Sequence, residues 1–230
     1  VNICSNKIPQ AFDGYKIVQI SDMHLKTLYG DTAFINRMVD TINSYNPDIV
    51  CFTGDLVSIR SDEMFPYIKN LSRFRAKNGV YSVLGNHDYG DYYKWPSPEA
   101  KEQNMQQMKN AQEQMGWNML NNSSVEIVAA SDTIVLIGVE NWGKPPFKRY
   151  GDLSVSYPAL YDDKYKILLT HDPAHWDTVL ATSNIDLTLS GHVHAMQFKI
   201  TLFGHSLSPA SYIHDRWSGR YDKDGATLYV

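Results

Sequence analysis

The segment LTLSGHVHAMQ (187–197) closes an apolar run at Gly191 and then presents two histidines, His192 and His194, separated by Val193. Side chains at positions i and i+2 of an extended chain point to the same side, so both imidazole rings can converge on one spot beyond a strand end. Such a pair fits a metal site, but an isolated His-X-His pair fits a polar turn beside a strand equally well. The other strand ends decide between these interpretations.

Four more apolar runs of the chain end in side chains able to bind a metal. In chain order, the runs are followed by Asp22 with His24, by Asp55, by Asn86-His87-Asp88, and by His171. Each alone could cap a turn or begin a loop. Sites in open α/β sheets form beyond the carboxyl ends of the strands. Burying these carboxylates and imidazoles together without a cation would leave charges and donors unpaired, at a cost of several kcal/mol, so we expect a metal centre.

The types of the candidate ligands narrow the choice of metal. Imidazoles, carboxylates and one amide oxygen, without a thiolate, suit Mn, Fe or Zn better than Ca or a structural Cys-type zinc site. The candidates also exceed the four ligands of one tetrahedral ion: Asp22, His24, Asp55, Asn86, His171, His192 and His194. Two ions about 3.5 to 4 Å apart could share them, with Asp55 as the bridge. Such a pair is suited to phosphoryl transfer.

The elements that must position these residues have the pattern of an α/β protein. Five short runs rich in β-branched residues predict strands that are buried on both faces: 16–20, 48–52, 80–84, 166–169 and 185–189. Helical spacing predicts a helix from Asp31 or Thr32 to before Pro47, and further helices over 61–77 and 98–115. The segments 123–129 and 133–139 resemble an antiparallel pair. We therefore expect a layered sandwich of mixed β-sheets flanked by helices, with the dinuclear metal site at the carboxyl ends of the strands.

Length and composition limit the classes to which the protein can belong. A chain of 230 residues is long enough for one domain with a full core, so we expect a single domain over 1–230. The net charge of −4 gives no overall basic field for nucleic acid. Two cysteines, Cys4 and Cys51, make neither a disulfide framework nor a Cys-based zinc site. No apolar run is long enough to cross a bilayer, and an anchor could precede Val1, so membrane association of the full-length protein stays open.

The ordered motifs DxH, GD, GNHD, H and GHxH, from Asp22 to His194, resemble those of the calcineurin-like metallophosphoesterase superfamily. The runs DGYKIVQISDMHL, TGDLV and GNHDYG are similar to a bacterial subgroup that is often tethered to membranes by an upstream segment. The resemblance implies that Asp22, His24 and His194 hold one metal, that Asn86, His171 and His192 hold the other, and that Asp55 bridges them. It also implies a hydroxide between the metals as the nucleophile, and His87 as the group that protonates or stabilises the leaving oxygen.

Two departures from related sequences bear on the partners of the site residues. Protein phosphatases of the superfamily have an Asp that pairs with the catalytic histidine where this chain has Ser58, so Asp88 or Asp22 could orient His87 instead. Ala195-Met196 replaces glycines found in related bacterial sequences, and these side chains either narrow the mouth of the site or fill the core.

The neighbours of the motifs carry further expectations. Asp172 follows His171 and could orient it as a carboxylate in the second layer around the metal. The remaining candidates, His175, His205 and His214, lack the strand-end context, so we expect surface or second-layer positions for them rather than ligation.

Three loops are candidates for substrate binding: 88–98, 141–151 and 212–221. Their aromatic and cationic side chains can stack on rings and bind phosphates, although the loops could equally well pack on the sheet. The cations are Lys94, Lys144, Lys148, Arg149, Arg216 and Arg220. The predicted function is hydrolysis of a phosphomonoester, phosphodiester or pyrophosphate, with a lipid- or nucleotide-linked compound as one possible substrate. The alternative is a non-catalytic metal-binding scaffold, against which the retention of His87 argues.

Overall fold

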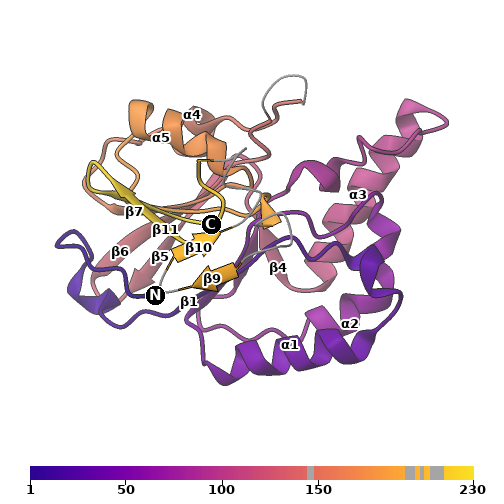
Figure 1. The fold of residues 1–230 in the computed structure, drawn as a ribbon, viewed down its shortest axis with the longest axis horizontal. Helices are drawn as coiled ribbons and strands as arrows, with labels where there is room; N and C mark the ends of the chain where they lie inside the picture. The colour runs from indigo at the N-terminus through magenta and orange to yellow at the C-terminus, as the bar shows by residue number, and fades with distance from the viewer. Residues whose placement is uncertain (144–147, 195–199, 203–204, 208–214) are drawn as a thin grey trace.

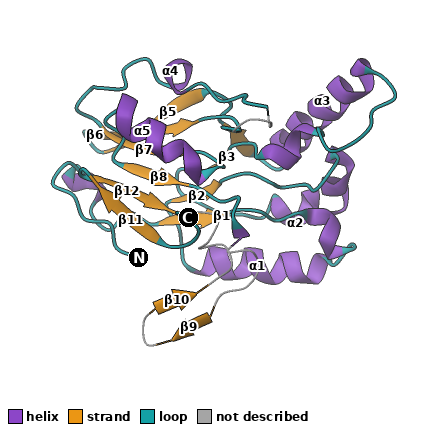
Figure 2. Cartoon of the chain, turned by 45° about the horizontal axis from the view of Figure 1, so that its top comes forward, coloured by secondary structure: helices purple, strands orange, loops and turns teal. Residues whose placement is uncertain are grey.

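The computed structural model describes residues 1–143, 148–194, 200–202, 205–207 and 215–230. Their main strands form two sheets (Figures 1 and 2). The first sheet is parallel, in the order β1 (Ile17–Ile20), β2 (Ile49–Phe52), β3 (Val80–Ser82) and β4 (Trp117–Met119). The second has the order β11 (Arg220–Lys223), β12 (Ala226–Tyr229), β8 (Leu187–Leu189), β7 (Tyr165–Leu169), β6 (Asp132–Gly138) and β5 (Ser123–Ala129).

The second sheet is mixed, because its outer strands β5 and β11 run antiparallel to a parallel centre. A separate antiparallel pair is formed by β9 (Ile200–Leu202) and β10 (His205–Leu207). The predicted strands and the predicted antiparallel pair are thereby confirmed, with bounds that differ by up to two residues at each end.

Helices cover the outer faces of both sheets. α1 (Thr32–Ser44), α2 (Ile68–Leu71) and α3 (Pro98–Gln114) lie beside the first sheet, and α4 (Leu153–Ser156) and α5 (Trp176–Thr182) lie beside the second (Figure 1). Short 3-10 helices lie in the connections: η1 (Gln10–Phe12), η2 (Leu25–Leu28), η3 (Ser61–Tyr67), η4 (Asn86–Tyr89) and η5 (Pro173–His175). The predicted α/β sandwich of mixed sheets flanked by helices is confirmed, and the single-domain organisation over 1–230 stays a prediction.

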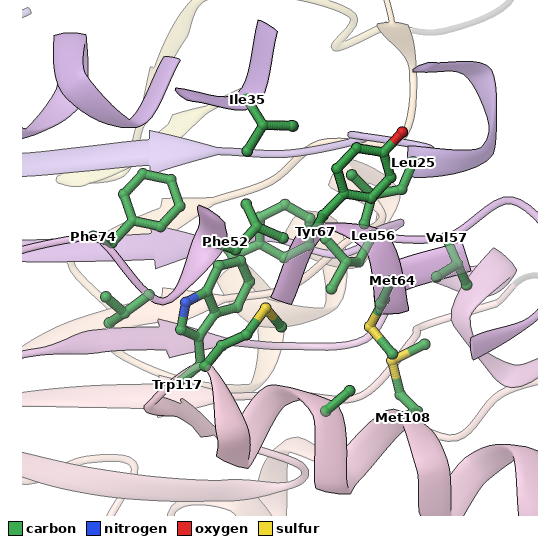
Figure 3. Packing of buried hydrophobic residues seen from close by; sticks show 14 of the residues in the cluster. Leu25, Ile35, Phe52, Leu56, Val57, Met64, Tyr67, Phe74, Met108 and Trp117 are labelled. Atoms are coloured by element: carbon green, nitrogen blue, oxygen red, sulfur yellow. The ribbon is translucent and has the colours of Figure 1, made fainter. Parts of the chain in front are cut away.

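Alternation along the buried strands explains the layers. In β2, Ile49 and Cys51 join an apolar cluster between the two sheets, while Val50 and Phe52 face the helices on the other side. The helix-side cluster includes Ile35 of α1 and Met108 of α3, and Figure 3 shows how these side chains surround Phe52 and Trp117. A third cluster fills the space between the second sheet and α5. The central strands are therefore buried on both faces, and β2 is apolar on both.

The segment 61–77 corrects the prediction of one continuous helix. Residues Ser61–Tyr67 form a 3-10 helix that contains Pro66, and the α-helical part ends at Leu71. Glu63 accepts hydrogen bonds from the backbone N–H groups of Ser58, Ile59 and Arg60, which fixes the start of this segment. By contrast, α1 begins where predicted, with Asp31 accepting a hydrogen bond from the N–H of Phe34.

Among the residues described here, no helix combines the length and the apolar character that a membrane span requires.

Candidate metal centre

The register of both sheets brings the candidate ligands to one edge. In the first sheet, Ile20 pairs with Phe52 and Phe52 pairs with Ser82, so the strands that precede Asp22, Asp55 and Asn86 end at one level. In the second sheet, Leu169 pairs with Leu189, which aligns the ends that precede His171 and His192. A hydrogen bond from the N–H of Gly191 to the carbonyl of His171 continues this alignment beyond the strands. The candidate ligands of each sheet therefore follow strand ends that lie level with one another.

Two groups of donor atoms form at this edge. One group consists of Asp22, His24, Asp55 and His194, and the other of Asp55, His171 and His192, with the donor atoms of each group within 4.8 Å of one another. Asp55 belongs to both. Its Oδ2 lies 3.1 Å from His171 Nε2 and 3.7 Å from His24 Nε2, while its Oδ1 accepts the backbone N–H of His87 at 2.9 Å. One carboxylate oxygen is therefore fixed by the backbone, and the other lies between the two groups.

Ring nitrogens face each other within both groups. His24 Nε2 lies 3.2 Å from His194 Nε2, and His192 Nδ1 lies 3.2 Å from His171 Nε2. In a neutral imidazole, one ring nitrogen is a donor and the other carries a lone pair. The Nδ1 of His171 donates to the carbonyl of Thr53 at 2.7 Å, which leaves its Nε2 as the lone-pair nitrogen that a metal would need. The donor set therefore fits metal ions.

Asn86, which directly follows the turn after β3, offers an amide oxygen as a further candidate ligand. Its Nδ2 donates to the hydroxyl of Tyr92 at 2.8 Å, whereas its Oδ1 is buried and has no hydrogen-bond partner among the described residues. A buried carbonyl oxygen without a partner costs free energy, and a cation would satisfy it. The residues present therefore fit a second ion as well as the first.

The carboxylates and the histidines of the site perturb each other's pKa values. Burial by itself raises the pKa of Asp22, but the hydrogen bond from His194 and the charge of His171 outweigh burial and hold that pKa well below its usual range. Burial lowers the pKa of His171, but the Asp55 carboxylate reverses this and raises it to about 10. His171 and Asp55 therefore favour each other's charged forms, and a bound cation would favour the charged carboxylates in the same way.

The backbone of the site is held in an unusual conformation. A positive φ is uncommon for any residue other than Gly, and it costs about 1–3 kcal/mol per residue unless the surroundings impose it. Five candidate ligands have one: Asp22 (56°), His24 (42°), Asp55 (59°), His192 (75°) and His194 (52°). This clustering indicates that the fold sets the positions of the donors before any ion binds.

Asp88 holds the loops of the site together, and its place corrects one expectation. Its buried carboxylate accepts the backbone N–H groups of Asp55 at 2.8 Å, Gly85 at 2.8 Å and Val57 at 3.1 Å. Burial raises the pKa of Asp88 to about 7, and the nearby Asp55 carboxylate acts in the same direction. Because its oxygens bind these N–H groups, Asp88 does not orient His87. The ring of His87 is held instead by the carbonyl of Ser58, which accepts from Nδ1 at 2.7 Å.

Asp172 does not make the expected hydrogen bond to the ring of His171. Its carboxylate accepts the N–H of Ala174 at 2.8 Å and caps η5, while the ring of the neighbouring His171 bonds to Thr53. Asp172 still acts on the site through its charge: burial and then the charge of His171 lower the pKa of His192, and the Asp172 carboxylate opposes this shift without reversing it. The partners of His87 and His171 are backbone carbonyls, which have no signature in the sequence.

Of His175, His205 and His214, only His175 has a described side chain, and it belongs to neither donor group. His175 is buried rather than at the surface, and its ring stacks on Trp142 with centroids 3.9 Å apart. His205 belongs to β10, and His214 lies outside the described residues, as do Ala195 and Met196. Sequence reasoning missed Tyr92, which contacts both Asn86 and His87, because nothing distinguishes it from Tyr93 in the run DYYKW.

The cations of the three candidate loops differ in their partners. Lys148, Arg216 and Arg220 form ion pairs with carboxylates, and Lys144 lies outside the described residues. Arg149 has no carboxylate partner in the described part of the chain, and its guanidinium lies 3.7 Å from the centre of the Trp142 ring. The stack of Arg149 on Trp142 on His175 is built from segments that follow the carboxyl ends of β6 and β7 in the chain. The Arg149 side chain is exposed and, among the described residues, is paired with a ring rather than with a carboxylate.

Gly85 lies so close to Asp55 that its missing side chain matters. A methyl group at this position would contact the Asp55 carboxylate and lie 2.6 Å from the Asp55 backbone nitrogen. We expect Gly85→Ala to lower the free energy of unfolding by about 1–3 kcal/mol, as overpacking does, and to reduce the metal content. Thermal melting and elemental analysis measure both effects.

The control is Gly116→Ala, because Gly116 has open space around it, and its cost comes only from a positive φ (74°) that Gly85, with a φ of −93°, does not have. This variant should lose about 1 kcal/mol without losing metal. If Gly85→Ala kept its full metal content, the close approach of the two loops would not matter for the site.

Three comparisons with known proteins agree with this arrangement. The family model described as calcineurin-like phosphoesterase matches residues 15–196. The metallophosphoesterase YkuE of Bacillus subtilis is 30% identical over 238 aligned positions, which cover 99% of this chain and 74% of that protein. Several further relatives are longer proteins, of which this chain spans 47% to 61%.

Similarity over part of the chain or at low identity adds two findings. The UDP-2,3-diacylglucosamine pyrophosphatase LpxG of Chlamydia muridarum is 38% identical over 90 residues, which cover 37% of this chain and 27% of that protein. The solved structure of the phosphopantetheinyl hydrolase of Mycobacterium tuberculosis has a TM-score of 0.50 and 14% identity, and the match covers 93% of this chain and 87% of that one. The second likeness concerns the fold alone.

Proposed function

This chain belongs to the calcineurin-like phosphoesterase family and is a metal-dependent phosphoric ester hydrolase, and we propose that it uses two metal ions to hydrolyse a phosphoester or pyrophosphate bond. The observation that carries the proposal is the place of Asp55, whose Oδ2 lies between two groups of donor atoms. The first ion would be held by Asp22, His24 and His194, and the second by Asn86, His171 and His192. Asp55 would be a ligand of both.

The donor set supports Mn, Fe or Zn as the bound ions. When bound, such ions supply Lewis acidity, which makes water acidic enough to attack near neutral pH and withdraws charge from the phosphoryl oxygens. The chain itself has to hold the donors rigidly, and the contacts of Asp88 and the positive φ angles of the ligands serve that purpose.

The proton for the leaving oxygen would come from His87. Its Nδ1 donates to the carbonyl of Ser58, so Nε2 is the nitrogen that would carry the transferable proton in the imidazolium form. The ring meets that of His24 edge to face, with centroids 4.9 Å apart, which places it against the first donor group. Its backbone N–H also donates to Asp55, so the acid and the shared ligand are positioned by the same short loop. His87 is therefore proposed as the general acid.

A panel of compounds tests the proposal. The protein, loaded with Mn²⁺, is assayed with a chromogenic phosphodiester, a phosphomonoester and a set of nucleotide- and lipid-linked diphosphates. We expect hydrolysis of at least one class, loss of that activity in a chelator, and its return when Mn²⁺ is added back. If the metal-loaded protein hydrolysed none of these classes, or if its activity survived complete removal of metal, the proposal would be wrong.

A pyrophosphate bond in a lipid- or nucleotide-linked compound is the candidate substrate that two observations favour. The name of LpxG assigns that protein a diphosphate substrate that carries both a nucleotide and acyl chains, and the similarity covers 90 residues. In addition, Arg149 is supported by a ring rather than by a carboxylate, so its N–H donors are available to a second phosphate. The buried His175 beneath the stack does not repel it, because burial and then the Arg149 charge lower the pKa of His175 to about 3.

Replacing Arg149 by Gln tests this candidate. Hydrogen bonds to a charged group contribute about 1.5–3 kcal/mol, so we expect KM for a diphosphate substrate to rise roughly 10- to 100-fold, with little change for a small phosphomonoester. The control is Arg75→Gln, since Arg75 is exposed and precedes β3 at the amino end of the first sheet. Equal changes in KM for both substrates would argue against a second phosphate at Arg149.

A further inference from the structure

Tyr92 is the residue that touches both the amide ligand and the proposed general acid. Its hydroxyl accepts a hydrogen bond from Asn86 Nδ2 at 2.8 Å, and its ring packs against that of His87 with centroids 4.5 Å apart. We propose that Tyr92 is a positioning residue, which turns the Asn86 amide so that its oxygen faces the second metal ion. The inference rests on the proposed function, because it needs that ion.

The argument starts from the two ends of the amide. An Asn side chain can present either a carbonyl oxygen, which binds a cation, or an NH₂ group, which is repelled by it. Rotation by about 180° exchanges the two ends at almost no steric cost, so a partner has to select one orientation. The hydrogen bond to Tyr92 occupies the NH₂ end and leaves Oδ1 buried and unpartnered among the described residues. The oxygen is thus the end of the amide that remains free to bind a cation.

The position of Tyr92 is set by its loop and not by burial of its own ring, since the residue is 46% exposed. Before Tyr92, Gly90 ends η4 with a φ of 67°, and Asp91 accepts from the Tyr150 hydroxyl at 2.6 Å and forms an ion pair with Lys101. After Tyr92, the indole of Trp95 donates to the carbonyl of Gly90 at 2.7 Å and closes the loop. The loop is therefore held by contacts that do not involve the Tyr92 hydroxyl, and removing that hydroxyl should not move it.

The hydroxyl and the ring of Tyr92 have separable roles. Tyr92→Phe keeps the ring beside His87 and removes only the hydrogen bond to Asn86. Tyr92→Leu removes both. The matched control is Tyr93→Phe, because Tyr93 is also exposed and its hydroxyl has no partner within the described ranges of the chain.

The experiment measures Mn²⁺ binding to the full chain by calorimetry, and hydrolysis separately. We expect Tyr92→Phe to weaken one of the two Mn²⁺ sites about 10- to 100-fold, the range for loss of a partner that orients a ligand, and to leave the other site unchanged. Tyr93→Phe should bind both ions like the wild type. At saturating Mn²⁺, Tyr92→Phe should recover most of its kcat, and Tyr92→Leu should not, because only the Leu variant lacks the ring beside His87.

A double-mutant cycle makes the assignment specific. If Tyr92 acts through Asn86, the double variant Tyr92→Phe, Asn86→Ala binds Mn²⁺ no more weakly than Asn86→Ala alone. Additive losses would overturn the proposal, and so would unchanged affinity of both sites in Tyr92→Phe; the proposed function would survive either result. A wild-type protein that binds no metal would overturn both.

Discussion

Asp55→Asn is expected to lower kcat/KM at least about a thousandfold and to deplete both metal ions, because one oxygen of this residue serves two groups of donors. The direction of the amide follows from the structure. Oδ1 of Asp55 accepts the backbone N–H of His87, so the carbonyl oxygen of the introduced Asn takes that place. Its NH₂ group then faces His171 and His24, where it cannot bind a cation.

The expected losses of metal and of activity in Asp55→Asn are measured by elemental analysis and by the rate of phosphodiester hydrolysis. Asp163→Asn serves as the matched control, because Asp163 is exposed, carries the same change of charge and precedes β7 at the amino end of that strand. The variant at position 163 should keep the metal content and activity of the wild type. If Asp55→Asn retained two tightly bound ions, a shared carboxylate would not be the basis of the centre.

His87→Ala is expected to have a large effect that depends on the leaving group. For an ester with an unactivated alcohol, loss of a general acid should lower kcat by about 10²- to 10⁴-fold. For an ester with an acidic phenol as leaving group, the fall should be small, since that group departs without a proton. The ring of His87 makes its hydrogen bond to the Ser58 carbonyl and belongs to neither donor group, so metal content should be preserved.

Pairs of esters that differ only in the pKa of the leaving alcohol provide the measurement. A steeper dependence of log kcat on that pKa in the variant than in the wild type identifies the missing proton donor. Equal slopes would show that His87 acts through binding or packing alone. Because the backbone N–H of residue 87 remains, its hydrogen bond to Asp55 is retained and does not confuse the result.

The strands could be predicted from the sequence because each central strand is buried on both faces and reads as a short apolar run, such as residues 48–52. The segment 61–77 could not be predicted in the same way, because apolar spacing does not record how tightly the backbone winds. Leu71 and Phe74 of the expected apolar face are buried, but Phe65 of that face is exposed and Met64 is buried instead. Pro66 and the hydrogen bonds to Glu63 favour a 3-10 start, and the turn after Leu71 ends the helix early.

The positions of the candidate ligands could be predicted from one rule, that parallel strands bring their carboxyl ends to one edge of the sheet. The close approach of Asp55, His171 and His192 agrees with this rule. The hydrogen-bond partners that orient these residues could not be predicted from the sequence. The carbonyls of Thr53 and Ser58 are available in any sequence, and whether they meet a histidine depends on loop conformation. Asp88 was expected beside His87 because it is adjacent in sequence, yet the turn of η4 directs it to the backbone behind Asp55.

The division of ligands between the two sheets has a mechanical consequence. Asp22, His24 and Asp55 follow strands of the first sheet, whereas His171, His192 and His194 follow strands of the second, and each donor group draws on both. An ion in either group would act as a cross-link between the two halves of the sandwich. Separating the halves would then require breaking coordinate bonds, so the order in which the protein comes apart on heating would depend on whether its metals had been removed first.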